Sequence, residues 1–311
     1  MKNLKLINRI KNFISVLLFL LLCYHVKLKG NMINQNSNQI DTSSVVKEYY
    51  LQGGEAERLS NGIWQIEKAR TENILHRFLP KSPATIVDVG GAAGAYALPL
   101  AKQGYEVYLI DLVPLHIEQA KKAEKLQSDH SLKACIVGDA RKIELSDSMT
   151  DVVLLMGPLY HLPDKKDRLM TISEAYRILK PGGLLFAVGI SRFASFIDGI
   201  IYRTLKDPIW HKIIVEDIKT GHHVNPTQKF QYFTTSFFHK PDELKEELEL
   251  TGFKKISILA IEGLGFLMPD FDKRWKDQEE RKILMSLLEM TESDPNMLAA
   301  SSHIMAIGKK E

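Results

Sequence analysis

Short apolar runs alternate with longer amphipathic segments over most of the chain, starting near residue 85. The runs are rich in β-branched residues and leucine, which is typical of strands buried on both faces. Between them lie segments of ten to fifteen residues with helical spacing of the apolar positions. This alternation predicts a doubly wound α/β fold of the Rossmann type, built on a seven-stranded sheet. We expect strands at 86–89, 105–110, 134–137, 151–155, 184–188, 255–261 and 303–308.

Two regions depart from this alternation. A short helix through Tyr49 and Tyr50 and a second helix at 63–78 precede the first strand, and we expect them to form an N-terminal helical lid. A less regular stretch, about 190–239, is rich in aromatic residues and is expected to be a helical cap inserted in mid-chain. Its aromatic residues suit a cover over an apolar acceptor, but they would equally form the core of the cap itself.

The N-terminal residues 1–31 differ from the rest of the chain. Basic residues flank an apolar run from Phe13 to Val26, which is shorter than the roughly 20 residues that a spanning helix needs. We therefore interpret 1–31 as a hydrophobic leader: either an uncleaved membrane anchor at 13–26, or untranslated sequence upstream of a true start at Met32. Residues 32–43 are then a polar linker, and 44–311 form the folded domain. The location is cytoplasmic, or else membrane-anchored with the domain in the cytosol.

Composition and charge exclude several classes of protein. The chain has 311 residues, with 45% hydrophobic and 25% charged residues, as in an ordinary globular protein. The formal net charge is only +3, and no basic run after the N-terminus suggests a nucleic-acid partner. Its two cysteines are far apart, so neither a disulfide framework nor a cysteine metal site is expected. Four histidines, His211, His222, His223 and His239, lack the spacing of a zinc site, and we expect no metal.

A glycine-rich loop follows the first expected strand, in the stretch Asp88-Val-Gly-Gly-Ala-Ala-Gly94. A strand, a small-residue loop and a helix place backbone N–H groups around one crevice, which suits a nucleotide-type ligand. The dinucleotide fingerprint G-x-G-x-x-G fits poorly, because alanine replaces two of its three glycines. The loop resembles the first motif of class I S-adenosylmethionine (SAM)-dependent methyltransferases, in which an acidic residue precedes G-x-G-x-G. Asp88, Gly90 and Gly94 match that motif, with Gly91 between them, whereas Ala92 replaces the middle glycine.

Three later segments extend the resemblance over residues 85–190. Asp111 ends the second strand and could accept both ribose hydroxyls of either NAD or SAM. The resemblance implies that Leu112 lies beside the cofactor, that Asp139 and Ala140 meet the adenine, and that Met156 lies near the methyl group. Leu179-Lys-Pro-Gly-Gly183 is a turn that recurs before the fifth strand in this family.

The segment Met156-Gly-Pro-Leu-Tyr-His-Leu162 takes the place of the acceptor motif of methyltransferases. It resembles a subset of small bacterial enzymes and lacks the Asn/Asp-Pro-Pro-aromatic motif of the amino-methylating DNA enzymes. Tyr160 and His161 could orient the acceptor or take its proton, and His161 could equally be a packing residue. Tyr49 could close over the cofactor.

The sequence thus predicts a SAM-dependent methyltransferase acting on a small-molecule acceptor. An NAD(P)-dependent oxidoreductase and a non-catalytic SAM-binding protein are the alternatives. The sequence names neither the acceptor nor the oligomeric state.

Overall fold

The computed structural model describes residues 42–51, 53–127, 131–227 and 229–311, which belong to one unit, Thr42–Glu311. The apolar run at 13–26, the proposed start at Met32 and most of the linker at 32–43 lie outside the described residues. Among the helices that the model describes, none has both the length and the apolar character needed to cross a membrane.

The apolar runs form a seven-stranded sheet, which confirms the predicted fold class. Its strand order is β3-β2-β1-β4-β5-β9-β8, and the strands β1 to β5 are parallel to one another. The exception to the expected parallel sheet is β9, which lies antiparallel between β5 and β8. The strands are β1 Thr85–Val89, β2 Glu106–Asp111, β3 Ala134–Val137, β4 Thr150–Leu155, β5 Leu179–Ile190, β8 Lys254–Ala260 and β9 His303–Lys309.

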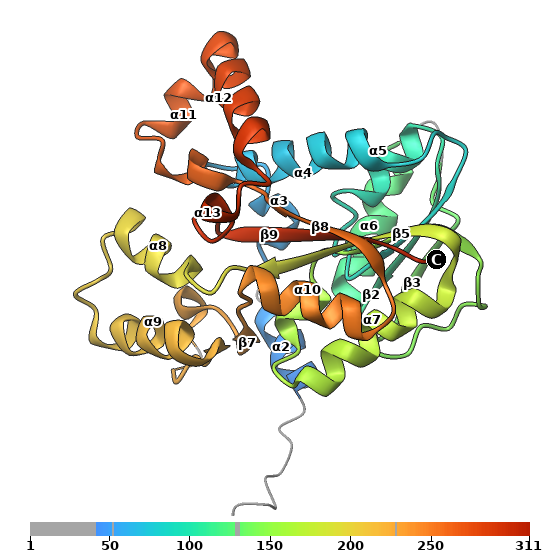
Figure 1. The fold of residues 1–311 in the computed structure, drawn as a ribbon, viewed down its shortest axis with the longest axis horizontal. Coiled ribbons are helices and arrows are strands. Elements are labelled where there is room, and N and C mark those ends of the chain that lie inside the picture. Colours follow the sequence, from blue (N-terminus) through green and yellow to red (C-terminus); the bar gives the residue numbers. More distant parts are fainter. Residues whose placement is uncertain (1–41, 52, 128–130, 228) are drawn as a thin grey trace, which may run out of the picture. The chain divides into compact units, whose positions relative to one another are not determined.

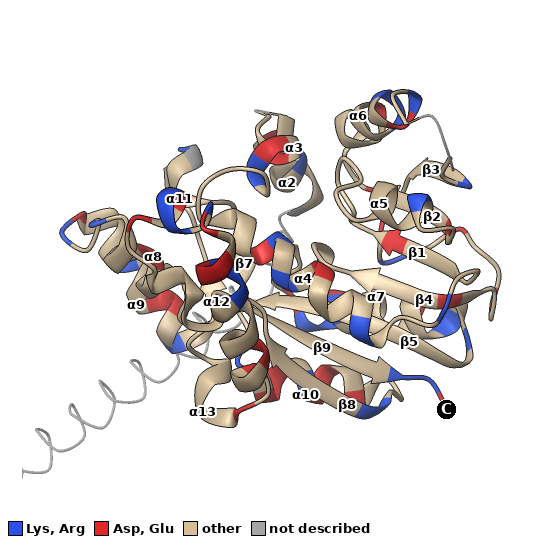
Figure 2. Cartoon of the chain, turned by 90° about the horizontal axis from the view of Figure 1, so that it is seen from above, with Lys and Arg blue, Asp and Glu red and all other residues tan. Residues whose placement is uncertain are grey.

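Helices cover both faces of the sheet (Figure 1). On one face, α4 (Trp64–Phe78), α5 (Ala97–Lys102) and α6 (Pro114–Lys125) contribute to a single buried cluster. On the other face, α7 (Lys165–Ile178) and α10 (Pro241–Leu250) contribute to a second cluster. Charged residues gather on the helices and loops, whereas the strands carry few of them (Figure 2).

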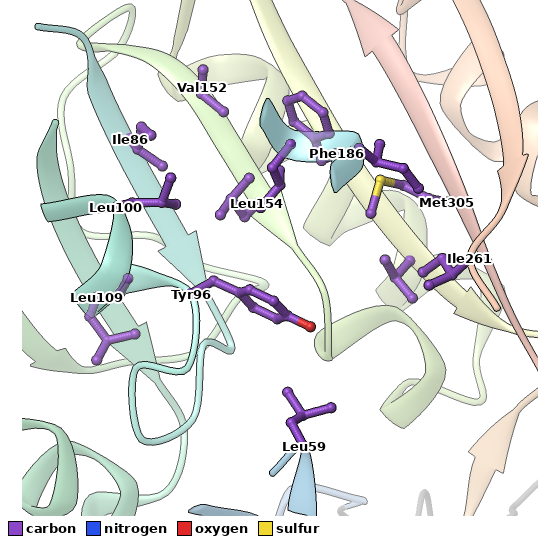
Figure 3. Packing of buried hydrophobic residues seen from close by; sticks show 14 of the residues in the cluster. Leu59, Ile86, Tyr96, Leu100, Leu109, Val152, Leu154, Phe186, Ile261 and Met305 are labelled. Atoms are coloured by element: carbon purple, nitrogen blue, oxygen red, sulfur yellow. The ribbon is translucent and has the colours of Figure 1, made fainter. Parts of the chain in front are cut away.

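Successive strand residues alternate between these two clusters. Ile86 and Leu154 pack with Leu100 of α5 and Phe186 of β5 on the first face (Figure 3), whereas Val87 packs on the second. Each such side chain, when fully buried, stabilises the fold by about 1.5–3 kcal/mol. The core is therefore centred on β1, β4 and β5, and it fixes the carboxyl ends of these strands at one edge of the sheet.

Two groups of elements stand beyond the sheet layers. The lid consists of α2 (Thr42–Leu51) and α3 (Glu55–Arg58), which come before α4 in the chain. The segment between β5 and α10, which we call the cap, contains α8 (Ala194–Ile201), α9 (Pro208–Thr220) and a two-stranded sheet of β6 (His222–His223) and β7 (Ser236–Phe237). In Figure 1 the yellow helices α8 and α9 lie side by side, and they are in contact.

The stretch between β8 and β9 is more structured than the sequence predicts. The single helix expected at 279–290 is α12 (Gln278–Thr291), but two short helices, α11 (Phe271–Arg274) and α13 (Pro295–Leu298), flank it. Phe266, Trp275 and Leu288 from this stretch pack against Ile66 of α4 in a small separate cluster. The short helices were missed because their apolar residues are too few to show a period.

Candidate functional site

Two adjoining cavities open at the carboxyl edge of the sheet. The first, of about 130 Å³, is lined by the loops after β1, β2, β3 and β4. The second, of about 730 Å³, lies between the lid and the cap. They share Tyr50, Glu55, Arg58 and Tyr160, so one continuous surface connects them. β1 is the point where the strand order reverses, and ligands of open α/β sheets bind at such points.

Most of the residues predicted to bind the cofactor line the first cavity. These are Gly90, Gly91, Asp111, Leu112, Asp139, Ala140 and Met156. Three others do not line it: Asp88 and Gly94 lie beneath or behind the loop, and Tyr49 lines the second cavity instead. Tyr50 lies against the first cavity in place of Tyr49, because neighbouring helix residues point about 100° apart.

Asp111 is held in the first cavity by three hydrogen bonds. One carboxylate oxygen accepts the Val113 N–H at 2.8 Å and faces Nδ1 of His116 at 3.0 Å, while the other accepts the Ala92 N–H at 2.9 Å. The carboxylate thus holds the glycine loop and the start of α6 in register. An ionised carboxylate offers about four acceptor positions, so capacity for a further donor is left.

Asp88 ends up under the loop, where it is fully buried. Neither of its oxygens makes a hydrogen bond of ordinary geometry to a described residue. Burial, with the nearby Asp111 charge, raises the pKa of Asp88 to about 7. A Cβ on Gly91 would lie 2.4 Å from Oδ2 of Asp88, so this glycine is required for the carboxylate to reach its position.

Gly90 has a structural role of its own. Its φ is +73°, a conformation that L-residues rarely adopt. A Cβ there would lie 2.6 Å from the ring of Pro158, in the loop after β4. The glycine therefore permits the close approach of the β1 and β4 loops, and any larger residue would disturb both.

Asp139 is engaged by a residue that sequence reasoning missed. The guanidinium of Arg141 donates to Asp139 at 2.6 Å, to Asp167 of α7 at 2.9 Å and to Ser43 of the lid at 2.9 Å. Burial opposes the charge of Asp139, but the hydrogen bonds from Arg141 lower its pKa overall. Arg141 thereby ties the lid to the loop after β3. Its spacing, two residues beyond an acid at a strand end, is the only sequence signal that could have indicated it.

Tyr160 and His161 lie in a 3-10 turn, Pro158–His161, after β4. The Tyr160 hydroxyl donates to the Met156 carbonyl at 3.1 Å, and burial raises its pKa. The Tyr50 hydroxyl lies 2.8 Å from Nε2 of His161, and burial lowers the pKa of His161 to about 3. A neutral imidazole can accept a hydrogen bond from that hydroxyl group. It is a poor proton acceptor for catalysis at neutral pH, since a base works best with a pKa near the working pH.

The lid closes onto the first cavity through Tyr50. Its ring packs edge-on against His116, 5.2 Å between centroids, and against His161 at 5.4 Å. His116 was not singled out from the sequence; it follows Asp111 by five residues, in the first turn of α6. The lid thereby narrows the first cavity, which continues into the second past Tyr50 and Tyr160.

Aromatic residues from the lid and the cap form the wall of the second cavity. They are Tyr49, Tyr50, Trp64, Tyr160, Tyr202, Trp210, Tyr232, Phe233 and Phe238. A buried network in the cap holds part of this wall in place. Asp217 accepts from the Ser195 hydroxyl at 2.5 Å and lies 2.9 Å from Nδ1 of His223, whose Nε2 faces the Tyr232 carbonyl at 2.8 Å.

Charged residues form the floor between the two cavities. Arg58 donates to Glu67 at 2.7 Å and to Glu55 at 3.1 Å. His303 is bonded to Glu262 at 2.5 Å, and the charges of Glu262 and Glu67 raise the pKa of His303 to about 9 despite its burial. Among the described residues, Glu67, Glu262 and His303 are the one group close enough to share a metal ion. Each already has a partner in the protein.

Comparison with known proteins agrees with this geometry. Residues 87–187 match a family model described as a methyltransferase domain. The chain is 25% identical to the ubiquinone/menaquinone biosynthesis C-methyltransferase UbiE of Neisseria meningitidis over 221 residues, 68% of this chain and 82% of that protein. It is 32% identical to the ubiquinone biosynthesis O-methyltransferase of Xylella fastidiosa over 130 residues, 40% of this chain and 49% of that protein.

Solved structures share the fold. A SAM-dependent methyltransferase from Methanosarcina mazei superposes with a TM-score of 0.51 at 20% identity, covering 76% of this chain and 96% of that one. The matched range 87–187 runs from β1 through the loops that line the first cavity to the middle of β5. The predicted methyltransferase domain is thus confirmed over residues 87–187.

Proposed function

We propose that this class I SAM-dependent methyltransferase holds its cofactor in the first cavity and a small-molecule acceptor in the second. The observation that carries the proposal is the junction of the two cavities at Tyr50, Glu55, Arg58 and Tyr160. Methyl transfer requires a donor site and an acceptor site that meet. Here one site is built on the strand ends and the other under the cap.

The residues of the first cavity suit an adenosine-containing ligand. Asp111 can accept from ribose hydroxyls, and Leu112 and Ala140 offer apolar surface to a base. Asp139 can accept a hydrogen bond from an amino group while it remains bonded to Arg141. When it is ionised, the buried Asp88 carboxylate places negative charge beneath the loop, and an ammonium group at the loop surface would favour that ionised form. When bound, SAM supplies a methyl group already activated for displacement.

The protein's own contribution is alignment and exclusion of water. Tyr160 and His161 would then be positioning residues: Tyr160 braces the β4 loop, and His161 holds the lid through Tyr50. With its lowered pKa, His161 is unsuited to take a proton from the acceptor.

A small acceptor suits the second cavity, whose volume lies in the usual range for small-molecule sites. The relatives act on small molecules by their names: the enzymes of Neisseria and Xylella serve ubiquinone or menaquinone biosynthesis. For this chain, we propose an acceptor with an apolar body that fits beneath the cap.

Calorimetric titration of the full chain with S-adenosylhomocysteine tests the cofactor half of this proposal. We expect saturable binding, weakened by substitution at Asp111. The Asp294→Asn variant is the matched control. It changes the N-cap residue of helix α13, far along the chain from Asp111, and should bind normally. Failure of the wild-type chain to bind the cofactor product would overturn the proposed function.

A further inference from the structure

The charges around the second cavity do not balance. Arg58 is paired with Glu55 and Glu67, and His303 with Glu262. Asp207 accepts from the Tyr232 hydroxyl at 2.7 Å and from the first N–H groups of α9. His223, the remaining basic side chain of the lining, lies against Asp217. Among the described residues of the lining, one carboxylate is then left without a partner, that of Asp198 on α8.

The side chain of Asp198 makes no hydrogen bond or ion pair to any residue that the structure describes, and its Oδ1 is buried. Burial raises the pKa of Asp198 to about 7; the Glu262 charge adds to this, while His303 and His223 oppose it. An isolated carboxylate in such a place is costly, since buried charges are normally paired.

Two further polar groups of the same cavity have no partner among the described residues. Ser302 is 3% exposed and Trp210 is 8% exposed, yet neither the Ser302 hydroxyl nor the Trp210 indole N–H has one. Native proteins leave few such groups, and each one calls for an explanation, such as a functional role or a bound water or ion. The unpaired atoms therefore mark where a ligand's polar end would lie.

Much of the rest of the wall is aromatic. Burial raises the pKa of Tyr202 to about 12, and the charge of the nearby Asp198 adds to this rise. Aromatic faces attract cations, and a carboxylate among them adds a full opposite charge. A neutral ligand could offer this carboxylate a hydrogen bond but no opposite charge, and an anionic ligand would be repelled by it.

We propose that the acceptor carries a protonated amino group on an apolar or aromatic body, and that Asp198 binds this group as a specificity-determining residue. The inference rests on the proposed function, because it takes the second cavity as the acceptor site. Asp198 anchors the amine end; the structure assigns it no part in methyl transfer itself.

Matched pairs of amines and alcohols test the proposal. The probes are tryptamine against tryptophol and 4-phenylbutylamine against 4-phenylbutanol, titrated at pH 8.5 into the full chain saturated with S-adenosylhomocysteine. We expect each amine to bind about ten- to hundredfold more tightly than its alcohol, as for hydrogen bonds to a charged group. Asp198→Asn, which keeps the shape of the side chain, should remove the preference. The smaller Asp198→Ser provides a second variant, and circular dichroism checks that both are folded.

Glu216→Gln is the matched control, since it removes one negative charge from the exposed side of α9 in the same cap. It should keep the full preference for amines. Equal binding of amine and alcohol by the wild type, a preference that survives in both Asp198 variants, or no binding of any amine would each overturn the proposal. Saturation with S-adenosylhomocysteine is measured first, so that a failure of the proposed function is seen separately.

Discussion

The two cavities of the site are built in different ways. The first is formed by loops that each follow directly on a strand of one sheet and is closed by the lid, and Asp111 and Asp139 in it are held by several hydrogen bonds. The second is formed by segments far apart in the chain, from Tyr49 in the lid to His303 on β9. Among the described residues, both linings include unpaired polar atoms, but an unpaired carboxylate, that of Asp198, is found only in the second. The contrast suggests a fixed cofactor site beside an acceptor site whose polar groups depend on the ligand.

The strongest test of this separation is Asp217→Ala, in the network of the cap. Removing one partner of a buried charged network costs about 3–5 kcal/mol. We expect hydrogen exchange to show a loosened cap while the sheet stays protected. Affinity for S-adenosylhomocysteine should stay within about twofold, because Asp217 does not line the first cavity. Glu216→Ala, on the exposed side of the same helix, is the control. Loss of cofactor affinity in the Asp217 variant would show that the cavities are not separable.

The pH dependence of stability tests the floor between the cavities. The folded pKa of His303 is about 9, above its usual 6.5, because Glu262 and Glu67 outweigh burial, with Arg58 opposing them. A raised pKa stabilises the fold below about pH 6.5, and the contribution is lost as the pH rises through about 9. The size of this contribution is about 3 kcal/mol. The free energy of unfolding in urea should be higher for the wild type than for His303→Gln at low pH, and this difference should shrink as the pH rises over this range. A constant difference would contradict the pairing of His303 with Glu262 and Glu67.

The cofactor side is tested by Asp111→Asn. Loss of the charge removes acceptor strength toward a ribose and toward the Ala92 and Val113 amides. We expect affinity for S-adenosylhomocysteine to fall about ten- to hundredfold by calorimetry. The amine preference of the second cavity should persist at saturating S-adenosylhomocysteine. Unchanged affinity in a folded variant would refute the ribose assignment.

The smallest effect is expected for Tyr50→Phe. Tyr50 belongs to the lid and lines both cavities. The substitution deletes one hydrogen bond, to His161, worth about 0.5–1.5 kcal/mol. Binding of S-adenosylhomocysteine should weaken by less than about tenfold, mainly through faster dissociation measured by stopped flow. Tyr49→Phe is the matched control on the same helix, because Tyr49 does not line the first cavity. Equal rates in the two variants would mean that Tyr50 does not latch the lid.

The sequence by itself determined the sheet and the first cavity. Its strands are continuous apolar runs, and each acid or glycine of the cavity follows directly on such a run, as Gly90 does on β1 and Asp111 at the end of β2. Because parallel strands place their carboxyl ends at one edge, local order in the sequence becomes proximity in space.

Only the tertiary structure decided what those residues do and what the second cavity contains. The placement of Asp88 under the loop, the engagement of Asp139 by Arg141 and the choice of Tyr50 over Tyr49 depend on side-chain packing, which has no period in the sequence. The second cavity joins α2, α8, the cap strands and β9, and its unpaired Asp198 is visible only once every other charge has found its partner. Such long-range pairing of charges is a property of the fold, because no local spacing encodes it.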